Sequence, residues 1–192
     1  MKNKILVIMA GGKSSRMQQD KALLPFNGYN SLTQYQYERF KPFFLKVYIS
    51  AKENKFDFPI NIIEDCYNES SPLVSIVSIF ETLKDIDEIF ILSVDSPFIT
   101  VELFNSLSKL ADKDSSVIVA ESQNGLEPLC AIYRRSTLSI AKDMLKENQH
   151  RLKVLLNRAK TQKVYFSDSK IFMNLNYPSD YDLAKRLSSF NI

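Results

Sequence analysis

The sequence predicts an α/β fold: a single domain in which a mostly parallel central sheet carries helices on both faces. Short apolar runs alternate along the chain with segments of helical spacing, and most runs are continuously apolar, as in strands covered on both faces. No linker, internal repeat or low-complexity tract divides the 192 residues, and 45% of them are hydrophobic. This length and composition suit one domain with a sizeable core, so residues 1–192 are taken as one unit.

The first part of the chain supplies strands and helices in alternation. Residues 5–9 (Ile-Leu-Val-Ile-Met) are continuously apolar and predict a buried strand. The sequence Ser-Leu-Thr-Gln at 31–34 is a capping box, which predicts a helix from there to residue 40. Residues 47–49 and 60–63 are short apolar runs and predict the second and third strands.

The alternation continues beyond residue 70. Apolar side chains over 73–83 recur at helical spacing, residues 89–94 form the most apolar strand, and a helix begins after a Thr100 cap. Residues 117–120 predict the next strand. In parallel sheets ligands bind beyond the carboxyl ends of the strands, so the chemistry is expected in the loops that follow residues 9, 49, 63 and 94.

Composition excludes several classes of protein. The formal net charge is +3, from 25 basic and 22 acidic residues, which is too mild to predict a nucleic-acid partner. No run of 18 apolar residues is present, so no membrane partner is expected, and the apolar stretch at 5–10 is too short for a secretory signal. Two cysteines, Cys66 and Cys130, make neither a disulfide framework nor a zinc site and suit a reducing cytoplasm.

The loop after the first strand carries two glycines and two cations. Gly11 and Gly12 let the backbone approach a ligand and aim N–H groups at phosphate oxygens, while Arg16 and Lys21 add positive charge. This combination suits a nucleoside triphosphate, which carries about four negative charges. A P-loop is excluded because Val7 stands where that motif needs glycine, and a G-x-G-x-x-G fingerprint is absent. A plain glycine turn with exposed basic residues is the alternative.

The same loop resembles a known family. Residues 10–17 read Ala-Gly-Gly-x-Ser-x-Arg-Met and residues 20–24 read Asp-Lys-Ala-Leu-Leu. This is similar to the signature of the molybdenum cofactor nucleotidyltransferases, above all the guanylyltransferases, although relatives usually have glycine where Gln18 stands. The resemblance implies a Rossmann-like nucleotidyltransferase fold and an enzyme that transfers a GMP moiety from GTP to the molybdopterin-type cofactor, with release of pyrophosphate.

The resemblance also implies ligands and roles. It gives Mg²⁺ as the cofactor, GTP and the molybdopterin-type cofactor as substrates, and molybdoenzyme maturation proteins as partners, in a cytoplasmic enzyme. Residues 1–100 would mainly bind the nucleotide and residues 101–192 mainly the acceptor. Arg16 and Lys21 would act as catalytic residues that stabilise the triphosphate. The nucleotide-binding residues implied in this loop are Met9, Ala10, Gly11, Gly12 and Lys21.

Asp95 ends the most apolar strand, where a carboxylate is costly unless it has a partner. An Mg²⁺ ion would keep it ionised and bridge it to triphosphate oxygens, and Pro97 fixes the turn that presents it. Asp95-Ser96-Pro97 resembles the family's metal-binding Asp-x-Pro, which makes Asp95 the expected metal ligand, a nucleotide contact and a catalytic residue. The alternative is a turn that Asp95 caps through Ser96.

Two further strand ends match the family less closely. By resemblance Asp65 contacts the guanosine part of the nucleotide, and Ser50 takes the place of a family asparagine; a solvated loop carboxylate is the alternative for Asp65. The family's Gly-Pro-Leu-x-Gly is here Ser-Pro-Leu-Val-Ser, at 71–75. Ser71 is therefore expected to cap the following helix, with Pro72 at its first position.

The end of the chain offers an acceptor side. Asn174 and Asn176 belong to Asn-x-Asn-x-Pro-x-Asp, which is similar to the family's closing motif. On an extended segment both amides point the same way and can bind phosphate, a pterin or the metal's water shell. The alternative is a turn before the last helix, with Ser179 as its cap and with Leu183 and Leu187 packed against the domain.

Other features of the second half carry less specific signals. Residues 127–134 (Glu-Pro-Leu-Cys-Ala-Ile-Tyr-Arg) resemble the family's Pro-Leu-x-Ala-x-Tyr-Arg, with Glu127 where many relatives have histidine. Cys130 has no adjoining activating partner and is expected to be a small buried hydrophobe. Between residues 127 and 163 nine basic residues face three acidic ones, as a solvated helix face or a surface for an anionic substrate. The only histidine, His150, is expected at an exposed helix end without chemistry.

Two other functions stay open at this point. One is a related transfer, of a cytidylyl group to the same pterin or of a nucleotidyl group to a sugar phosphate, because the Ala-Gly-Gly loop serves several such enzymes. The other is a nucleotide-binding delivery or regulatory module without turnover, which the departures at Gln18, Ser71, Ser75 and Glu127 keep open.

Overall fold

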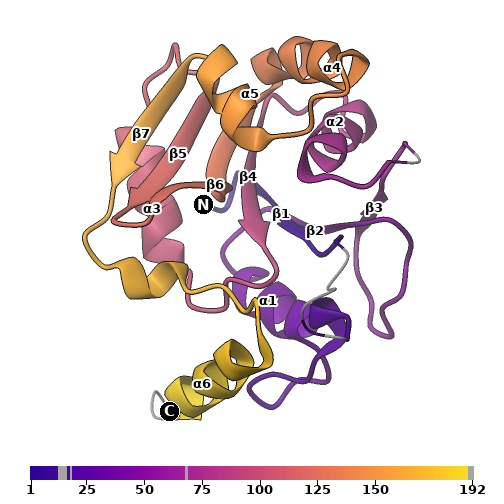
Figure 1. Cartoon of the computed structure of the whole chain (residues 1–192), viewed down its shortest axis with the longest axis vertical. Helices are drawn as coiled ribbons and strands as arrows, with labels where there is room; N and C mark the ends of the chain where they lie inside the picture. The colour runs from indigo at the N-terminus through magenta and orange to yellow at the C-terminus, as the bar shows by residue number, and fades with distance from the viewer. Residues whose placement is uncertain (13–16, 18, 68, 190–192) are drawn as a thin grey trace.

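The computed structural model describes residues 1–12, 17, 19–67 and 69–189, and within them a seven-stranded sheet forms the centre of the molecule (Figure 1). Its strands are β1 (Ile5–Met9), β2 (Lys46–Ala51), β3 (Ile62–Glu64), β4 (Glu88–Ser93), β5 (Val117–Ser122), β6 (Gly125–Arg134) and β7 (Thr161–Tyr165). Along the sheet they follow the order β3-β2-β1-β4-β6-β5-β7. β6 runs antiparallel to β4 and β5, whereas the other recorded pairings are parallel. The predicted mostly parallel sheet is therefore confirmed.

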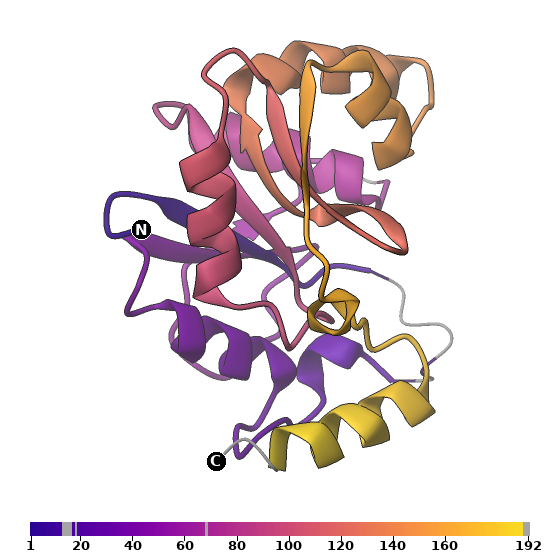
Figure 2. The same cartoon turned by 90° about the vertical axis from the view of Figure 1, so that its left-hand side faces the viewer.

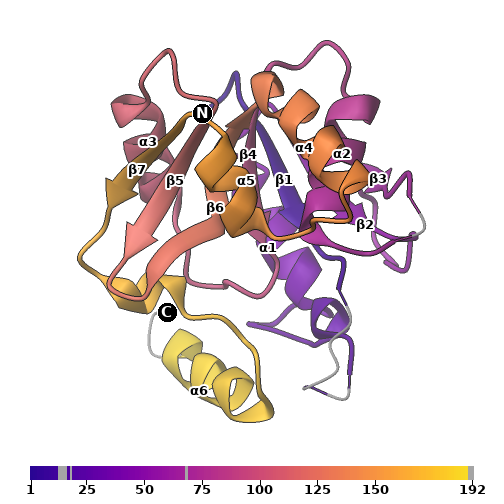
Figure 3. The ribbon, with the colours of Figure 1, turned by 45° about the horizontal axis from the view of Figure 1, so that its top comes forward.

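Helices cover both faces of this sheet. They are α1 (Leu32–Phe40), α2 (Pro72–Thr82), α3 (Val101–Leu110), α4 (Leu138–Lys146), α5 (Leu152–Arg158) and α6 (Pro178–Ser189), with short 3-10 turns η1 (Lys21–Leu23), η2 (Arg135–Thr137) and η3 (Ser169–Phe172). Leu6 and Ile8 of β1 share an apolar cluster with α1, α3 and α6, and Val7 and Met9 share one with α2, α4 and α5. In Figure 2 the helix α3 lies in front of the sheet. In Figure 3 the helices α4 and α5 lie in front of the strands. No helix in the described part of the chain is both long and apolar enough to cross a membrane.

The elements predicted in the first part of the chain are present, with small shifts at their ends. β1 covers the predicted residues, and β4 is one residue out of phase at each end of the prediction. At the start of α1, Ser31 Oγ accepts the N–H of Gln34 at 3.1 Å, as the capping box predicts. The Gln34 side chain differs from the motif, because it accepts the N–H of Asn30 at 3.2 Å rather than that of the cap residue.

The prediction for the last helix is wrong in its details. α6 begins at Pro178, so Ser179 lies inside its first turn and is not the cap. The carboxylate of Asp180, the third residue of the helix, reaches back to the residues before it: its Oδ2 accepts the N–H groups of Asn176 (3.0 Å) and Tyr177 (2.8 Å), as the acidic residue of a capping box does. The side chains predicted to pack are exposed instead, Leu183 at 40% and Leu187 at 44%, and Ala184 is the buried residue among the described side chains of this helix.

Candidate functional site

Three adjoining cavities lie at the carboxyl ends of β1 and β4, the edge of the sheet where the sequence predicts the chemistry. The first, of about 640 Å³, lies between the loop after β1 and the start of α2. The second, of about 110 Å³, lies between the ends of β1 and β4 and the turn η1, and the third, of about 200 Å³, lies between β4, β6 and the segment before α6. Ser93, the last residue of β4, lines all three, so a ligand that spans them is possible in size and position.

Lys21 lines the second cavity and contacts two residues that line the third. Its Nζ donates to Asp95 Oδ2 and to Asn176 Oδ1, both at 3.0 Å. The side chains of Lys21 and Asp95 are 15% and 20% exposed, so the pair is sheltered but within reach of a ligand. Asp95 Oδ1 accepts the hydroxyl of Ser93 at 2.6 Å. Among the described residues the recorded partners of this carboxylate are thus Ser93 and Lys21, and not Ser96 as the turn alternative requires.

A short 3-10 turn aims Lys21 at β4. Asp20 Oδ1 accepts the N–H of Ala22 at 3.0 Å and so caps η1. At its other end the turn closes through the N–H of Leu24, which donates to the carbonyl of Lys21 at 3.2 Å. The hydroxyl of Thr33 donates to the carbonyl of Ala22 at 2.8 Å and ties the turn to α1. Lys21 therefore extends from a backbone that is fixed by hydrogen bonds at both ends of the turn and by the contact with α1.

The loop that carries Asp95 is held by two polar residues of α1. Gln36 Nε2 donates to the carbonyl of Ser96 at 2.9 Å, and Arg39 donates to the carbonyls of Pro97 (2.6 Å) and Ile99 (2.7 Å). Burial lowers the pKa of the Arg39 guanidinium, although nearby Tyr35 opposes this. Sequence analysis missed both residues; their signal was a pair of polar side chains three apart on the buried face of a helix.

Asn174 and Asn176, the asparagines of the closing motif, lie in the segment before α6. Both line the third cavity together with Asp95. Asn176 Oδ1 accepts from Lys21, and Asn174 Oδ1 accepts the hydroxyl of Ser96 at 2.6 Å. Between them, the N–H of Leu175 donates to the carbonyl of Asp95 at 2.9 Å. The two amides thus line one cavity but contact different segments, and the segment before α6 is fastened to the end of β4.

An irregularity in β6 forms the opposite wall of the third cavity. Ala131 pairs with Val119 while Glu127 pairs with Ala120, so residues 128–130 have no partner in the β5–β6 ladder, although Cys130 stays paired with Leu92 of β4. Burial raises the pKa of Glu127, against the effects of Ser122 and Lys153. Cys130 also lines this cavity, but the residue is buried, and burial raises the pKa of its thiol far above the ordinary value. The prediction that Cys130 is a small buried hydrophobe is confirmed.

Ser50 and Asp65 are not among the described residues that line the three cavities. Ser50 is 1% exposed, its carbonyl accepts the N–H of Ala10 at 2.8 Å, and its hydroxyl has no partner among the described residues. Burial raises the pKa of Asp65, and Ser75 and Lys52, which line the first cavity, lower it in part. Their predicted contacts with the nucleotide stay predictions. Arg16 and Gln18 lie outside the described residues, so the role of Arg16 stays a prediction as well.

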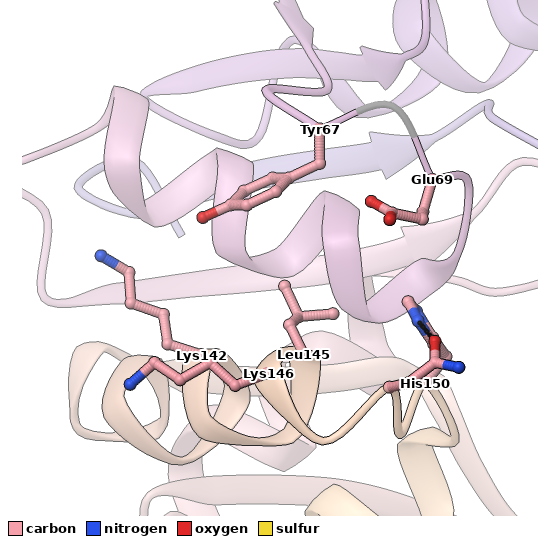
Figure 4. Close-up of a pocket in the computed structure, with 7 residues that line it drawn as sticks. Tyr67, Glu69, Lys142, Leu145, Lys146 and His150 are labelled. Atoms are coloured by element: carbon pink, nitrogen blue, oxygen red, sulfur yellow. Dashed lines mark hydrogen bonds between the residues drawn. The ribbon is translucent and has the colours of Figure 1, made fainter.

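Ser71 caps α2, as predicted, and also contacts His150. Its Oγ accepts the N–H of Val74 at 3.2 Å, with Pro72 in the first turn, and lies 2.9 Å from His150 Nδ1. His150 Nε2 lies 3.1 Å from Asn148 Oδ1, and the ring faces a separate cavity between α4 and the segment before α2 (Figure 4). The expectation of an exposed helix-end histidine is therefore wrong: His150 is half-buried, because its ring bridges the α4–α5 connection and the cap of α2.

The basic stretch of the second half is largely ion-paired. Arg134 contacts Glu88 at 3.0 Å, and Arg135 donates to the carbonyls of Phe80 and Ile86 near the end of α2. Arg151 and Lys153 have no ion pair recorded in the part of the chain that the structure describes, and both are exposed. This favours a solvated, ion-paired surface for most of the stretch. The other paired cations are Lys142, Lys146, Arg158, Lys160 and Lys163.

The chain is similar to known proteins over most of its length. A family model described as the MobA-like NTP transferase domain matches residues 6–164. A molybdenum cofactor guanylyltransferase from Campylobacter jejuni is 36% identical over 181 residues, which is 93% of this chain and 94% of that relative. Another from Helicobacter pylori is 35% identical over 198 residues, covering 97% of this chain and 96% of the relative.

Solved structures are similar in fold. A crystal structure of molybdopterin-guanine dinucleotide biosynthesis protein A from Archaeoglobus fulgidus gives a TM-score of 0.82 at 17% identity, over 97% of this chain and 99% of that one. CMP:2-keto-3-deoxy-manno-octonic acid synthetase, solved with CTP, gives 0.78 at 15% identity, over 99% and 100%. At these identities the likeness shows the fold alone, and it confirms the predicted Rossmann-like α/β architecture.

Proposed function

Because this chain belongs to the family of MobA-like NTP transferase domains, we propose that it is an enzyme that transfers a GMP moiety from GTP to the molybdopterin-type cofactor. The products are the guanine dinucleotide form of the cofactor and pyrophosphate. One observation carries the proposal: Lys21 contacts both Asp95 and Asn176, where cavities from the two halves of the chain meet. A cation at that point lies between a nucleotide on one side and an acceptor on the other.

The nucleotide occupies the first cavity and extends its phosphates into the second. Met9 and Gly11 line both cavities, so the backbone after β1 runs along the nucleotide. Gly12 has a φ of +139°, which residues with a side chain rarely adopt, and space is open where its Cβ would stand. Amide N–H groups at this bend and the ammonium of Lys21 stabilise the triphosphate. Asp65 and Ser50, behind the first cavity, are the proposed contacts nearer to the guanosine.

Asp95 is the proposed ligand of a divalent metal, taken to be Mg²⁺. Among the described residues no group of three or more His, Cys, Asp or Glu side chains is placed to hold a metal ion. Mg²⁺ often binds through one or two carboxylates together with substrate phosphates and water, so a single carboxylate from the chain is enough to hold it. The partly open Asp95 carboxylate, beside the cavity for the phosphates, meets that requirement. When bound, the ion neutralises phosphate charge and makes the α-phosphorus a better electrophile.

The acceptor lies in the third cavity, where Asn174 and Asn176 bind its terminal phosphate or its pterin. An oxygen of that phosphate attacks the α-phosphorus of GTP and forms a new P–O bond. The bond from the α-phosphorus to the oxygen that bridges to the β-phosphate breaks, and pyrophosphate leaves with the electron pair. The attacking oxygen is already an anion, so the reaction needs neither a protein base nor a nucleophile, and the residues act by position and charge.

The proposal includes the compartment of the reaction and the recipients of its product. We place the reaction in the cytoplasm, where GTP is available and the two thiols, recorded as free, remain reduced. The product is bulky and is consumed by other proteins, so molybdoenzyme maturation proteins are the proposed recipients. Neither nucleic acid nor a membrane takes part in this scheme.

The experiment is a calorimetric titration of the intact chain with GTP, with and without Mg²⁺, followed by an assay of pyrophosphate release with purified acceptor. We expect GTP binding that Mg²⁺ strengthens, and pyrophosphate release that requires the acceptor. Failure of the chain to bind GTP in the presence of Mg²⁺ would contradict the proposal. Binding without any release would indicate the delivery or regulatory module, and competition by CTP, or transfer to a sugar phosphate, would indicate one of the related transferases.

A further inference from the structure

Lys55 makes two contacts that bring together distant points of the proposed nucleotide site. It lies in the segment between β2 and β3, outside every motif singled out in the sequence. Its Nζ forms an ion pair with Asp20 Oδ2 and donates to the carbonyl of Ala10 at 3.3 Å. The side chains of Lys55 and Asp20 are 22% and 33% exposed, so the contact is partly sheltered. Lys55 thus joins the residue that follows β1 to the residue that precedes Lys21.

Both of the oxygen atoms that Lys55 contacts belong to residues of the second cavity. Ala10 and Asp20 line this cavity together with Lys21 and Asp95. A carbonyl and a carboxylate are acceptors only, so neither can bond to a phosphate oxygen. An unpaired Asp20 carboxylate would also repel the roughly four negative charges of a bound nucleoside triphosphate. The site therefore contains a negative group that works against its proposed ligand unless a cation compensates it.

The two oxygen atoms of Asp20 have separate tasks. Oδ1 accepts the N–H of Ala22 and caps the turn that aims Lys21. Oδ2 is the atom that Lys55 contacts. Asp20 is therefore useful as a cap and unfavourable as a charge, and Lys55 neutralises the charge without competing for the cap. An asparagine at this position would keep the capping oxygen and lose the charge, which allows the two tasks to be separated experimentally.

We propose that Lys55 is a positioning residue that compensates Asp20 and holds it and the Ala10 carbonyl away from the nucleotide, and so sets the affinity of the site for the triphosphate. The inference rests on the proposed function, and it adds a residue that neither the family motifs nor the cavity walls contain. Its distinctive consequence is a loss of nucleotide affinity that increases with the number of phosphates. Loss of the Lys55 charge should weaken binding in proportion to the number of phosphates on the nucleotide, because the repulsion acts on the phosphates and not on the base.

The test measures the affinities of GTP, GDP and GMP by calorimetry with Mg²⁺, for the unaltered chain and for Lys55→Met. We expect about tenfold weaker binding of GTP, a smaller loss for GDP and little change for GMP, a tenfold loss being about 1.4 kcal/mol. Lys55→Arg keeps the charge and should bind GTP nearly normally. Asp20→Asn added to Lys55→Met should restore most of the GTP affinity. Lys46→Met, at the opposite end of β2 where Nζ lies 4.8 Å from the Tyr48 ring centroid, is the matched control.

Each other outcome overturns the inference. An equal loss for all three nucleotides would show that Lys55 merely supports the fold, and so would failure of Asp20→Asn to restore binding. Unchanged GTP affinity in Lys55→Met would show that it has no role. If Lys55→Met does not fold, Lys55→Gln keeps an N–H donor for Ala10, removes the charge and must show the same gradation. A wild-type chain that binds no GTP contradicts the proposed function itself, which distinguishes that failure from a failure confined to Lys55.

Discussion

Lys21 Nζ lies 3.0 Å from Asp95 Oδ2, although the two residues are 74 positions apart in the sequence. One comes from a capped 3-10 turn after β1 and the other from the end of β4, so the contact depends on the parallel pairing of β1 with β4. A cation and a carboxylate that hold each other before substrate arrives need little rearrangement when phosphate and metal enter between them. The pair is thus both a structural contact and the centre of the proposed chemistry.

Replacement of Lys21 should reduce turnover far more than stability. In Lys21→Ala the triphosphate loses its ammonium partner, and we expect kcat/KM for GTP to fall by about 10²–10³-fold, as for removal of one well-placed donor to transition-state charge. Steady-state pyrophosphate release measures this. Lys142→Ala is the matched control. Lys142 lies on α4, away from the three cavities of the site, and contacts Glu81 of α2 at 2.7 Å. Equal losses in both variants would contradict a specific role for Lys21.

Replacement of Asp95 should remove the effect of magnesium. Asp95→Asn keeps the shape and an acceptor for the Ser93 hydroxyl, but an amide oxygen is a much weaker ligand for Mg²⁺ than a carboxylate. We expect GTP binding that no longer tightens when Mg²⁺ is added, measured by calorimetry with and without a chelator. Glu88→Gln changes the carboxylate at the other end of β4 and should leave the Mg²⁺ effect intact. Persistence of that effect in Asp95→Asn would move the metal to another ligand.

Sequence alone reached the parts of the fold that local pattern determines. β1, β4 and the helices between them follow from continuous apolar runs, helical spacing and capping residues such as Ser31 and Ser71, all of which act within a few positions. β6 was not predicted, because Glu127 and Pro128 interrupt its apolar run. Its position between β4 and β5 depends on antiparallel pairing, which no short sequence pattern encodes.

The site divides in the same way. Resemblance to a family motif identified Lys21, Asp95, Asn174 and Asn176, and the structure brings these together. The residues that hold them, Gln36 and Arg39 on α1 and Lys55 after β2, were not predicted. Their partners are backbone carbonyls or a carboxylate more than 30 positions away, and such contacts exist only once the chain is folded.

Arg39 should be the most sensitive of these supports. Its guanidinium extends from α1 and donates hydrogen bonds to the carbonyls of Pro97 and Ile99. Arg39→Met would therefore leave two sheltered acceptors without this donor. We expect a loss of about 2–4 kcal/mol in the free energy of unfolding, measured by urea denaturation. Arg151→Met replaces an exposed arginine and should cost less than about 0.5 kcal/mol. A similar small cost for both would show that the Asp95 loop does not need α1.

Ser71 should be replaceable by glycine more readily than by alanine. Its hydroxyl caps α2 and contacts His150, so Ser71→Ala should cost about 1 kcal/mol in the free energy of unfolding, whereas Ser71→Gly should cost only a few tenths. A double-mutant cycle with His150→Ala isolates the contact between the two side chains. Thr100→Ala, at the cap of α3, provides the comparison for a cap without a histidine. Strict additivity in the cycle would contradict an energetic contribution from the His150 contact.

Glu88 should make part of the free energy of unfolding depend on pH. Burial alone would raise the pKa of Glu88, but hydrogen bonds from Lys4 (2.7 Å) and Arg134 (3.0 Å) outweigh it and hold that pKa below its ordinary value of 4.5. A carboxyl group whose pKa is lower in the folded chain stabilises it at pH values above the unfolded pKa. That contribution is lost as the pH falls through the folded pKa, where the unfolded chain takes up the proton more readily.

Glu88→Gln removes the titrating group and keeps the shape. The variant should be less stable than the wild-type chain at about pH 7, and the difference should shrink as the pH falls below the ordinary carboxyl range and through the lowered pKa of Glu88. Urea denaturation of both proteins across this range measures it, and the comparison cancels the carboxyl groups that they share. A difference that stays constant with pH would mean that Glu88 contributes through packing between β4 and β6 rather than through its charge, because only the charge is lost as the pH falls.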